Sequence, residues 1–458
     1  MLDPVPDKKY DCKMSFLKTE KMYQTITEPE GVEENRKLSI GSITIILIIG
    51  FLLRLLWWAY AEPVPISDYE EYRILAHGLL YNGSFGIQNP SAWRLPGYPF
   101  FLASMMLISN SIAWLSLTNV VLSTALIYIV YKTALQLTSE KFLSICAALI
   151  CALNPTFVFL SPVLASEHMF SLLLFSAFLL VTKKRNSNKV MLRFFFSGLM
   201  FGAAMLTRGE GIFFLPIYLL MAFWSSNRMP IKIVTIIILI FSVGIAVTPW
   251  YIRNHLSVGP GSSLSTSGGI NFYFAHNDVH YGWRSLEGTI FDGKDEIEQQ
   301  KLGYQLGMDY LSSVGFTAIM KDILKATKRL FLKSGEYSVE YSIRLQRSVN
   351  KPSYPYPIKN LPGTKVFFTL TKAYFGLFFC AVFSCLFLLR YSIEVWTFLY
   401  GTVLVNWIGY SWIFWSKARY RYTSEIIFCI LAALVISEIS KRLPIKKDDL
   451  FKTIITFI

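Results

Sequence analysis

Charged residues are scarce in this chain. Only 16% of its 458 residues are Asp, Glu, Lys or Arg, and 53% are hydrophobic. A soluble domain of ordinary composition carries about 25% charged residues, so the shortage argues against a soluble protein. Apolar runs of roughly 18 or more residues recur from Leu38 onward, each long enough to cross a hydrocarbon core of ~30 Å. Because no alternating strand pattern is visible, these runs are predicted to be helices, and the chain to be an all-α polytopic membrane protein.

Cysteines are few, and none lies where it would carry chemistry. Of the six, Cys12 lies in the N-terminal segment and the other five lie in apolar runs. The sequence therefore predicts neither disulfides nor a cysteine metal site. Walker loops, GxSxG elbows, dinucleotide fingerprints and repeats of about 20–50 residues are absent as well, which leaves no nucleotide, α/β-hydrolase or solenoid signature.

The formal charge of +14 comes mostly from bases beside the ends of the predicted spans. One basic connection covers 183–193, and another follows the last span at 441–447. Lys and Arg at span ends are typical of cytoplasmic loops. Lipid headgroups therefore explain the charge, and nucleic acid is not a predicted partner.

About ten transmembrane helices are predicted from the apolar runs. They cover about 38–58, 112–136, 141–163, 165–182, 190–207, 209–226, 230–249, 364–389, 392–412 and 419–440. With 183–193 inside, both termini are cytoplasmic, and 59–111 and 250–362 form two large extracytoplasmic loops. The short apolar segment 96–110 is interpreted as interfacial. Counting it as a crossing gives an eleven-span alternative with one terminus outside.

Four parts follow from this topology. Residues 1–36 are polar and mixed in charge, so we expect a disordered cytoplasmic tail without a visible cleavable signal peptide. Residues 37–249 form the N-terminal transmembrane catalytic module, which includes the first outer loop. Residues 250–362 form an extracytoplasmic loop region, and 363–458 supply the C-terminal transmembrane helices and a basic cytoplasmic tail. Within the loop region, 302–331 has the apolar spacing of one or two amphipathic helices.

An acidic cluster, Asp68, Glu70 and Glu71, closely follows the first span. Residues 68–82 are predicted to form a short helix, which places Asp68 and Glu71 on one face and Glu70 on another. A carboxylate here is a candidate general base toward a hydroxyl or an amine. The alternative is structural: Ser67 or Asp68 caps the helix, and the glutamates favour its dipole.

Three further polar residues are predicted at the same membrane face. Arg94, beside Trp93, is suited to clamping a phosphate, with snorkelling to lipid headgroups as the alternative. Glu167 and His168 lie in a tight outer turn, where a carboxylate and an imidazole are costly unless they are used or paired. Both are candidate substrate contacts, and a solvated turn is the alternative.

Several cations lie at the outer ends of other predicted spans. Arg208 and Arg253 each follow an apolar run, and Lys417, Arg419 and Arg421 precede the last one, against the inside bias of basic residues. Cations gathered at the outer leaflet suit a lipid-linked phosphate or diphosphate, whose charge must be neutralised close to hydrocarbon.

The large loop 250–362 offers a sugar-binding pattern rather than a metal site. Polar and aromatic residues surround Asn271, which fits the wall of a sugar site. His276 and Asp278 lie two apart, but no supporting ligand spacing accompanies them, so no metal ligand is assigned. The acidic cluster is compatible with a divalent cation, yet nothing in the sequence supports one, and no cofactor is predicted.

Taken in order, these segments resemble the membrane glycosyltransferases of the C superfamily that use polyprenyl-phosphate sugars. The likeness is to the bacterial branch related to protein O-mannosyltransferases and the lipid A aminoarabinose transferase, and it spans roughly 38–440. The landmarks are Asp68-Tyr69-Glu70-Glu71-Tyr72, Arg94-Leu95-Pro96-Gly97-Tyr98-Pro99-Phe100-Phe101-Leu102-Ala103, Ala165-Ser166-Glu167, Leu206-Thr207-Arg208-Gly209-Glu210, Pro249-Trp250-Tyr251-Ile252-Arg253-Asn254, Gly269-Ile270-Asn271-Phe272-Tyr273 and Arg419-Tyr420-Arg421-Tyr422.

The resemblance implies roles for particular residues. Asp68 is the counterpart of an acidic residue that the superfamily needs for transfer, and it would activate the acceptor in an inverting single displacement while the lipid phosphate leaves. Arg94 stands where relatives contact the donor phosphate, and Glu167 where they carry a second outer acid. This chain departs from the pattern at His168, where a proline is common, and at Trp93, where some relatives carry an acid.

The sequence thus predicts a multi-pass glycosyltransferase of the cell (inner) membrane. It would transfer a sugar from a polyprenyl-phosphate donor to a glycan, lipid or protein acceptor on the extracytoplasmic face. The predicted catalytic residues are Asp68 and Glu71, and the predicted substrate contacts are Glu70, Arg94, Glu167, His168, Arg208, Arg253, Asn271, Arg419 and Arg421. The alternative is a transporter or flippase of lipid-linked sugars, which normally carries midplane charges and repeated halves. Arg54 is the nearest such charge and is interpreted as snorkelling.

Overall fold

The computed structural model describes residues 30–61, 65, 67–182, 190–224, 229–277, 289–332, 364–388 and 391–442. Every regular element in this part of the chain is a helix, so the predicted all-α class is confirmed for it. The chain divides into two compact units, Met1–Ile45 and Ile46–Ile458. The bundle and the candidate site belong to the second unit. Helix α2 (Glu30–Ala61) begins within the segment predicted to be a disordered tail.

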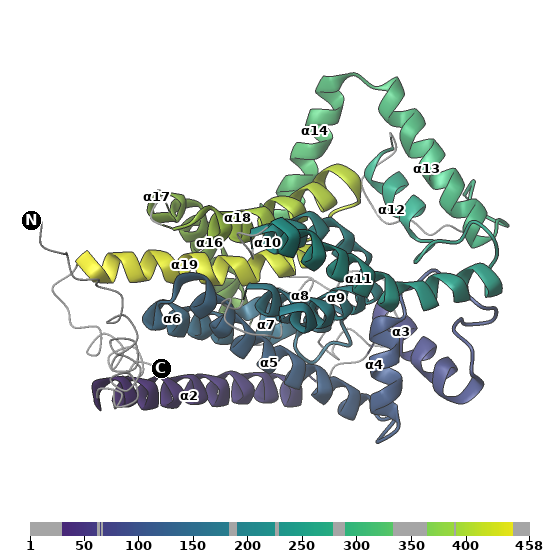
Figure 1. Ribbon diagram of the computed structural model, residues 1–458. Coiled ribbons are helices and arrows are strands. Elements are labelled where there is room, and N and C mark those ends of the chain that lie inside the picture. Colours follow the sequence, from purple (N-terminus) through teal and green to yellow (C-terminus); the bar gives the residue numbers. More distant parts are fainter. Residues whose placement is uncertain are drawn as a thin grey trace, which may run out of the picture. The chain divides into compact units, whose positions relative to one another are not determined.

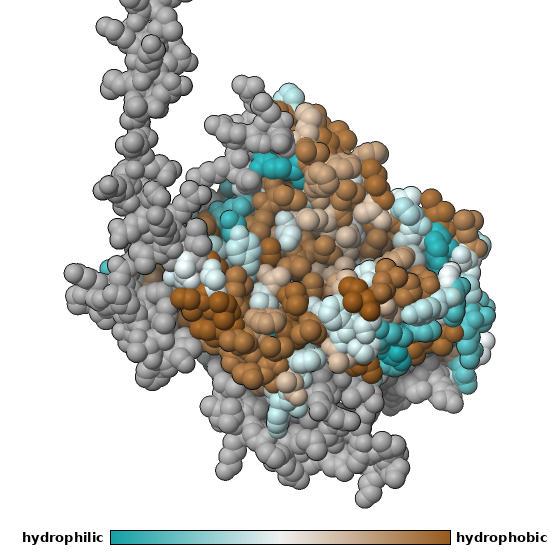
Figure 2. All heavy atoms as spheres, turned by 90° about the horizontal axis from the view of Figure 1, so that it is seen from below, coloured by the Kyte–Doolittle hydropathy of each residue, from teal (hydrophilic) through white to brown (hydrophobic). Residues whose placement is uncertain are grey.

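Five segments of the described chain are long and apolar enough to cross a membrane. They are Gly41–Ala61 of α2, α5 (Ile112–Thr138), α9 (Val190–Thr207), α11 (Met229–Ser257) and Ala418–Arg442, which contains α19 (Tyr422–Arg442). Other helices of the described chain include α6 (Lys141–Leu153), α8 (Glu167–Thr182), α10 (Leu215–Trp224), α16 (Thr364–Phe383), α17 (Cys385–Leu388) and α18 (Ile393–Ile408). Much of the face in Figure 2 is covered by hydrophobic residues, as expected for helices that contact lipid. The count of ten spans stays a prediction.

Helix α19 forms the centre of the bundle. It packs against α6, α16 and α18, and nearly all of its side chains are buried. Figure 1 shows α19 among these helices, with α5, α8 and α9 on the adjoining side. A helix of 21 residues is about 30 Å long. Its two ends therefore lie about one hydrocarbon thickness apart.

The interpretation of Arg54 as a snorkelling residue is wrong, because its side chain is completely buried. Its guanidinium donates to the carbonyls of Ala152 and Cys151, to the carbonyl of Gly50 and to Ser123 Oγ. Those first two carbonyls belong to the last turn of α6. The last carbonyls of a helix have no N–H of the same helix to accept from. Arg54 therefore closes the end of α6, where the chain turns into α7 (Pro155–Leu160).

The segment predicted to be the first outer loop folds as two short helices and a tight loop. Helix α3 (Asp68–His77) continues into the π-helical turn η1 (Gly78–Asn82), which confirms the predicted helix over 68–82. Helix α4 (Gly97–Met106) has 10 residues, so it is only about 15 Å long and too short to cross the bilayer. In Figure 1 α3 and α4 lie across the direction of α5 and α19, in agreement with an interfacial segment.

The segment predicted to be the second outer loop contributes a hairpin of two helices, as its apolar spacing predicts. Helices α13 (Glu296–Ser313) and α14 (Phe316–Thr327) form it, followed by the π-helical turn η3 (Lys328–Leu332). Short helix α12 (Gly268–Ala275) packs on α13 (Figure 1). The packing needs glycine, since a Cβ on Gly269 would lie 1.9 Å from the Gln300 carbonyl oxygen, and one on Gly303 would lie 2.4 Å from the Gly269 oxygen. This contact fixes α12 beside the site.

Candidate active site

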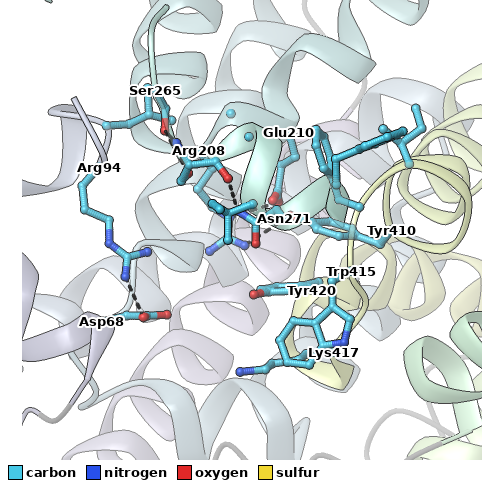
Figure 3. Close-up of a pocket in the computed structure, with 18 of the residues that line it drawn as sticks. Asp68, Arg94, Arg208, Glu210, Ser265, Asn271, Tyr410, Trp415, Lys417 and Tyr420 are labelled. Atoms are coloured by element: carbon cyan, nitrogen blue, oxygen red, sulfur yellow. Dashed lines mark hydrogen bonds and ion pairs between the residues drawn. The ribbon is translucent and has the colours of Figure 1, made fainter. Parts of the chain in front are cut away.

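A cavity of about 1210 Å³ lies at the N-terminal end of α19. Its walls come from the start of α3, from the segment before α4, from η2 (Gly209–Phe214), from α12 with the loop before it, and from 410–420. Segment 410–420 includes part of the π-helical turn η6 (Gly409–Ile413) and of the 3-10 turn η7 (Ala418–Arg421). The cavity therefore gathers segments that are far apart in the sequence (Figure 3).

Asp68 is held between two arginines at the edge of this cavity. Its Oδ1 accepts a hydrogen bond from Arg94 Nη2 at 2.7 Å, and its Oδ2 accepts one from Arg419 Nη2 at 2.5 Å. Arg94 Nη2 lies 2.7 Å from Glu71 as well, and Arg94 Nε donates to the same Glu71 oxygen at 2.8 Å. Arg419 also donates to the hydroxyl of Tyr69. The two carboxylates thus lie on either side of one guanidinium.

The helix periodicity of α3 explains this arrangement. Asp68 and Glu71 are three apart and share a face, as predicted, whereas Glu70 points elsewhere and pairs with Arg73 at 2.5 Å. Ser67 makes no side-chain capping bond and has a positive φ of 52°. Because Ser67 does not cap the helix through its side chain and Asp68 binds two cations, the capping alternative does not account for these residues.

Charge pairing fixes the protonation of this group. Burial alone would raise the pKa of Asp68, but Arg419 and Arg94 outweigh it and hold the pKa well below its usual range. Burial alone would lower the pKa of Arg94, but Asp68, Tyr72 and Glu71 raise it overall. Asp68 is therefore a carboxylate at every pH at which the protein is expected to work, and a weak proton acceptor while both arginines hold it.

A second ion-pair network lies directly behind the first. Arg208 Nη1 lies 2.8 Å from Glu167 Oε1, and Arg208 Nε lies 3.1 Å from Glu210 Oε1. Glu167 also faces Arg419 Nε at 3.9 Å. Arg208 and Glu210 line the cavity, whereas Glu167 is buried just behind its wall. Glu167 therefore connects Arg208 to Arg419, and through Arg419 to Asp68.

Lys417 has no carboxylate partner in the described part of the chain. Its ammonium nitrogen lies 4.4 Å from the centre of the Trp415 ring, and its side chain is directed to the side of the cavity where Asp68 lies (Figure 3). Burial, together with the nearby Arg419, lowers the pKa of Lys417 to about 8. An ammonium in this state is ready to accept an anion.

Uncharged polar groups also line the cavity. Asn271 of α12 lines the cavity, and its amide donates to the Ser267 carbonyl. Ser265 and Ser267 bond to one another through their hydroxyls, and Ser265 also donates to the Trp93 carbonyl. Trp93 and Trp415 line the same cavity. Neutral hydrogen-bonding groups beside indole rings suit a sugar ring, which has polar edges and apolar faces.

The charges around the cavity favour an anion. Five basic residues line it, namely Arg94, Arg208, Arg329, Lys417 and Arg419, against two acidic residues, Asp68 and Glu210. The bases remain in excess when Glu71 and Glu167, just behind the wall, are included. Among the described residues, no group of three or more His, Cys, Asp or Glu side chains is placed to hold a metal ion.

Among the predicted substrate contacts that do not line this cavity, three are held by interactions within the protein. His168 is fully buried, with one ring nitrogen 2.6 Å from the Tyr422 hydroxyl and the other 3.0 Å from the Leu160 carbonyl oxygen. Arg421 is buried against Glu425 at 2.6 Å. Arg253 donates to the carbonyls of Phe85 and Ser91. These interactions inside the protein occupy the groups that would otherwise bind substrate, so structural roles suit these three residues better.

The other predicted residues divide between the cavity and its surroundings. Asp68, Arg94, Arg208, Asn271 and Arg419 line it, and Glu71 and Glu167 pair with those that do. Glu70 makes its ion pair away from it. Residues not assigned from the sequence are Glu210, Trp415, the serines before α12 and Lys417. Of these, Lys417 was detectable, because it is part of the basic cluster that violates the inside bias.

Comparisons with known proteins agree with the landmarks. Residues 90–250 match the sequence model of a family described as dolichyl-phosphate-mannose-protein mannosyltransferase. The fold is similar to the apo crystal structure of the oligosaccharyltransferase of Archaeoglobus fulgidus, with a TM-score of 0.55 and 14% identity over 91% of this chain and 51% of that chain. A second structure is the archaeal oligosaccharyltransferase AglB from the same organism in complex with an inhibitory peptide and a dolichol-phosphate. It gives a TM-score of 0.54 and 14% identity over 93% of this chain and 52% of that chain.

This chain thus spans about half the length of the oligosaccharyltransferase chains that it matches. The structure of ArnT from Cupriavidus metallidurans bound to undecaprenyl phosphate aligns at a TM-score of 0.36 with 10% identity, over 87% of this chain and 77% of that chain. No curated protein matches the chain in sequence. The family match over residues 90–250 and the fold shared with the oligosaccharyltransferases agree with the predicted resemblance to the C superfamily.

Proposed function

We propose that this protein transfers a sugar from a polyprenyl-phosphate donor to an acceptor hydroxyl or amine, in the cavity at the N-terminal end of α19. The observation that supports this proposal most is that one cavity is lined both by a carboxylate, Asp68, and by an excess of cations that includes Lys417. A nucleophile needs a base, and a phosphate leaving group needs cations. The cavity provides both within one set of contacting residues.

The donor phosphate would lie among Arg94, Lys417 and Arg419. Arg94 and Arg419 both contact Asp68, and Lys417 lies close to Arg419. Arginine binds phosphate through paired N–H groups and lysine as a point charge. Asn271 and the indoles of Trp93 and Trp415 would then face the sugar. The dolichol-phosphate in the complex with AglB supports a lipid phosphate as the class of donor.

The reaction follows as a single displacement. The acceptor oxygen or nitrogen bonds to the anomeric carbon, and its proton passes to Asp68. The bond between that carbon and the phosphate oxygen breaks, and its electrons leave with the polyprenyl phosphate, whose developing negative charge Arg94 and Arg419 stabilise. Attack opposite the leaving group inverts the anomeric configuration.

Donor binding would prepare Asp68 for this role. In the empty cavity Arg94 and Arg419 keep Asp68 a weak base. A phosphate that takes up hydrogen bonds from these arginines weakens their hold on Asp68 and raises its proton affinity. Glu167 contributes by holding Arg208 and Arg419 in place. The ion pairs thus connect leaving-group binding to activation of the nucleophile.

The topology belongs to the same proposal. The chain would cross the membrane ten times, with both termini in the cytoplasm of a cell whose inner membrane it occupies and with the cavity on the extracytoplasmic face. Cysteine-accessibility labelling tests this arrangement. Positions near Ser67 and Asn277 should be labelled from outside and a position near Asn186 from inside, and the reverse pattern would contradict it.

The direct test uses purified protein in nanodiscs and a panel of polyprenyl-phosphate sugars. The expected result is release of polyprenyl phosphate with one donor, together with transfer of the sugar to a native acceptor present in membrane extract. A flippase would instead move the intact donor between leaflets without releasing phosphate. That outcome would replace the proposed reaction by transport.

A further inference from the structure

A second, smaller cavity lies on the other side of Arg94. It measures about 340 Å³, at the lower end of the roughly 300–1,000 Å³ typical of small-ligand sites. Its walls are formed by Glu71, Leu75, Ile87, Gln88, Asn89, Ser91 and Arg94. Arg94 is the residue that it shares with the large cavity. The ion pair between Arg94 and Glu71 therefore stands between the two cavities.

The loop that forms this cavity is held at both ends by residues from distant elements. Arg253 of α11 donates to the Phe85 and Ser91 carbonyls at 2.8 Å and 2.7 Å. Glu296 of α13 accepts from the Ser91 hydroxyl at 2.8 Å and from the Ala92 N–H at 2.7 Å. Two buried or half-buried charges thus fix a loop whose outer side chains, including Gln88 and Asn89, remain exposed. A fixed loop with free amides is suited to binding.

We infer that this second cavity receives the acceptor, and that the acceptor is a hydroxyl-rich sugar. The inference rests on the proposed function. Glu71, Gln88 and Asn89 offer a carboxylate and two amides to hydroxyl groups, and Leu75 and Ile87 offer an apolar surface to a ring face. An anionic group would meet the carboxylate of Glu71, which disfavours it. A neutral sugar ring matches both kinds of wall.

Geometry joins this site to the proposed base. Asp68 and Glu71 both lie 2.7 Å from Arg94 Nη2, so only that group separates Glu71, in the small cavity, from Asp68, in the large one. When Arg94 turns to the donor phosphate, the partition opens and the acceptor hydroxyl reaches Asp68. Its oxygen then bonds to the anomeric carbon, its proton passes to Asp68, and the phosphate leaves with the electrons of the broken bond. Donor binding thus precedes productive acceptor binding.

Protection of an introduced cysteine tests this site without an activity assay. Gln88→Cys protein in nanodiscs is labelled with a small maleimide, and the modified peptide is quantified by mass spectrometry, with and without methyl glycosides. We expect at least one glycoside to slow labelling of position 88, and added undecaprenyl phosphate to strengthen the protection. Ser313→Cys, an exposed position on the α13–α14 hairpin, is the control whose labelling rate stays unchanged.

A functional arm separates acceptor from donor. With the best protecting glycoside as acceptor, Gln88→Trp should raise the acceptor KM about tenfold by filling the cavity, while the donor KM stays within about twofold. Protection by a serine-containing peptide but by no glycoside would overturn the sugar assignment. If a glycoside protected position 88 equally with and without undecaprenyl phosphate, the proposed opening of the partition would be wrong. If the donor bound normally and no probe protected position 88, this inference alone would be wrong. If the wild-type protein failed to bind lipid phosphate, the proposed function would be wrong.

Discussion

At the N-terminal end of α19, Asp68, Arg94, Lys417 and Arg419 line a cavity, and Lys417 has no carboxylate partner there. At the C-terminal end, Glu140 and Glu438 both pair with Lys441, at 2.9 Å and 2.6 Å. Both clusters combine acidic and basic residues, and they lie about 30 Å apart along one helix. They differ in whether every charged group has a partner of opposite charge.

The cluster around Glu140 is closed on itself. One oxygen of Glu140 accepts from Tyr391 and Lys441, and the other accepts from Ser437. Each of these bonds joins α19 or the start of α18 to the turn between α5 and α6. The cluster at Asp68 instead keeps an excess of positive charge around open space. A cluster in which every charged group is paired holds helices together, whereas a cation without a carboxylate partner beside a cavity indicates a ligand of opposite charge.

The largest effect that separates the two clusters should come from Asp68→Asn. Loss of a general base costs roughly 10²- to 10⁴-fold in rate, so we expect kcat to fall by that range. The donor KM should not rise, because the variant frees Arg94 and Arg419 for the phosphate. Glu70→Gln, three residues from Arg73 and away from the cavity, is the control. An Asp68→Asn protein with wild-type kcat would remove the proposed base.

Lys417→Met should act on donor binding instead of on the rate. A hydrogen bond to a charged group contributes about 1.5–3 kcal/mol, which corresponds to about 10- to 100-fold in affinity. We therefore expect the dissociation constant of undecaprenyl phosphate to rise by that factor. Lys325→Met removes a lysine that pairs with Asp322 on the exposed face of α14, and it should leave affinity unchanged. Equal losses in both variants would mean that general surface charge, and not the cavity, attracts the lipid.

The same lysine should give the donor reaction a pH dependence. Because the pKa of Lys417 is lowered to about 8, its ammonium is charged below that pH and neutral above it. The kcat/KM for donor, which reports ionisations of the free enzyme, should fall as the pH rises through about 8. Lys417→Arg should remove this limb, since arginine stays protonated throughout. If kcat/KM of the Lys417→Arg variant still fell as the pH rose through about 8, another ionisable group would be responsible.

The smallest effect on transfer is expected from a substitution in the cluster around Glu140. Glu140→Gln weakens an ion pair that is about a third exposed, and such pairs are worth about 0–1 kcal/mol. The midpoint of thermal unfolding should fall by a few degrees at most, with kcat per folded molecule unchanged. A loss of kcat comparable to that of Asp68→Asn would show that the two ends of α19 are coupled.

The sequence alone predicts the local geometry of the site better than its long-range contacts. Helical spacing places Asp68 and Glu71 on one face, and the structure agrees. The contacts of Asp68 with Arg94 and Arg419 join residues 26 and 351 positions apart in the chain. No local pattern reports such a contact, because tertiary packing creates it. The predicted topology and the ordered landmarks of the resemblance anticipated that these segments lie at one face, but not which side chains meet.

Neighbouring arginines show where sequence reasoning fails in detail. Arg419 and Arg421 look equivalent in sequence, and both were predicted to bind substrate. In η7 the chain is a 3-10 turn with three residues per turn, so positions two apart point in different directions. Arg419 enters the cavity, whereas Arg421 enters the core and pairs with Glu425. The helical path of this short segment decides this outcome, because an extended strand would place both side chains on one face, and composition does not reveal it.

The most direct test of the account compares Asp68→Asn and Lys417→Met in one single-turnover experiment with a saturable polyprenyl-phosphate sugar. The two substitutions should separate: Asp68→Asn binds the donor as tightly as the wild type but transfers slowly, and Lys417→Met binds weakly but transfers at the wild-type rate once saturated. If both substitutions reduced affinity alone, or if Asp68→Asn transferred at the wild-type rate, the cavity would not contain the base and the phosphate site that the account assigns to it.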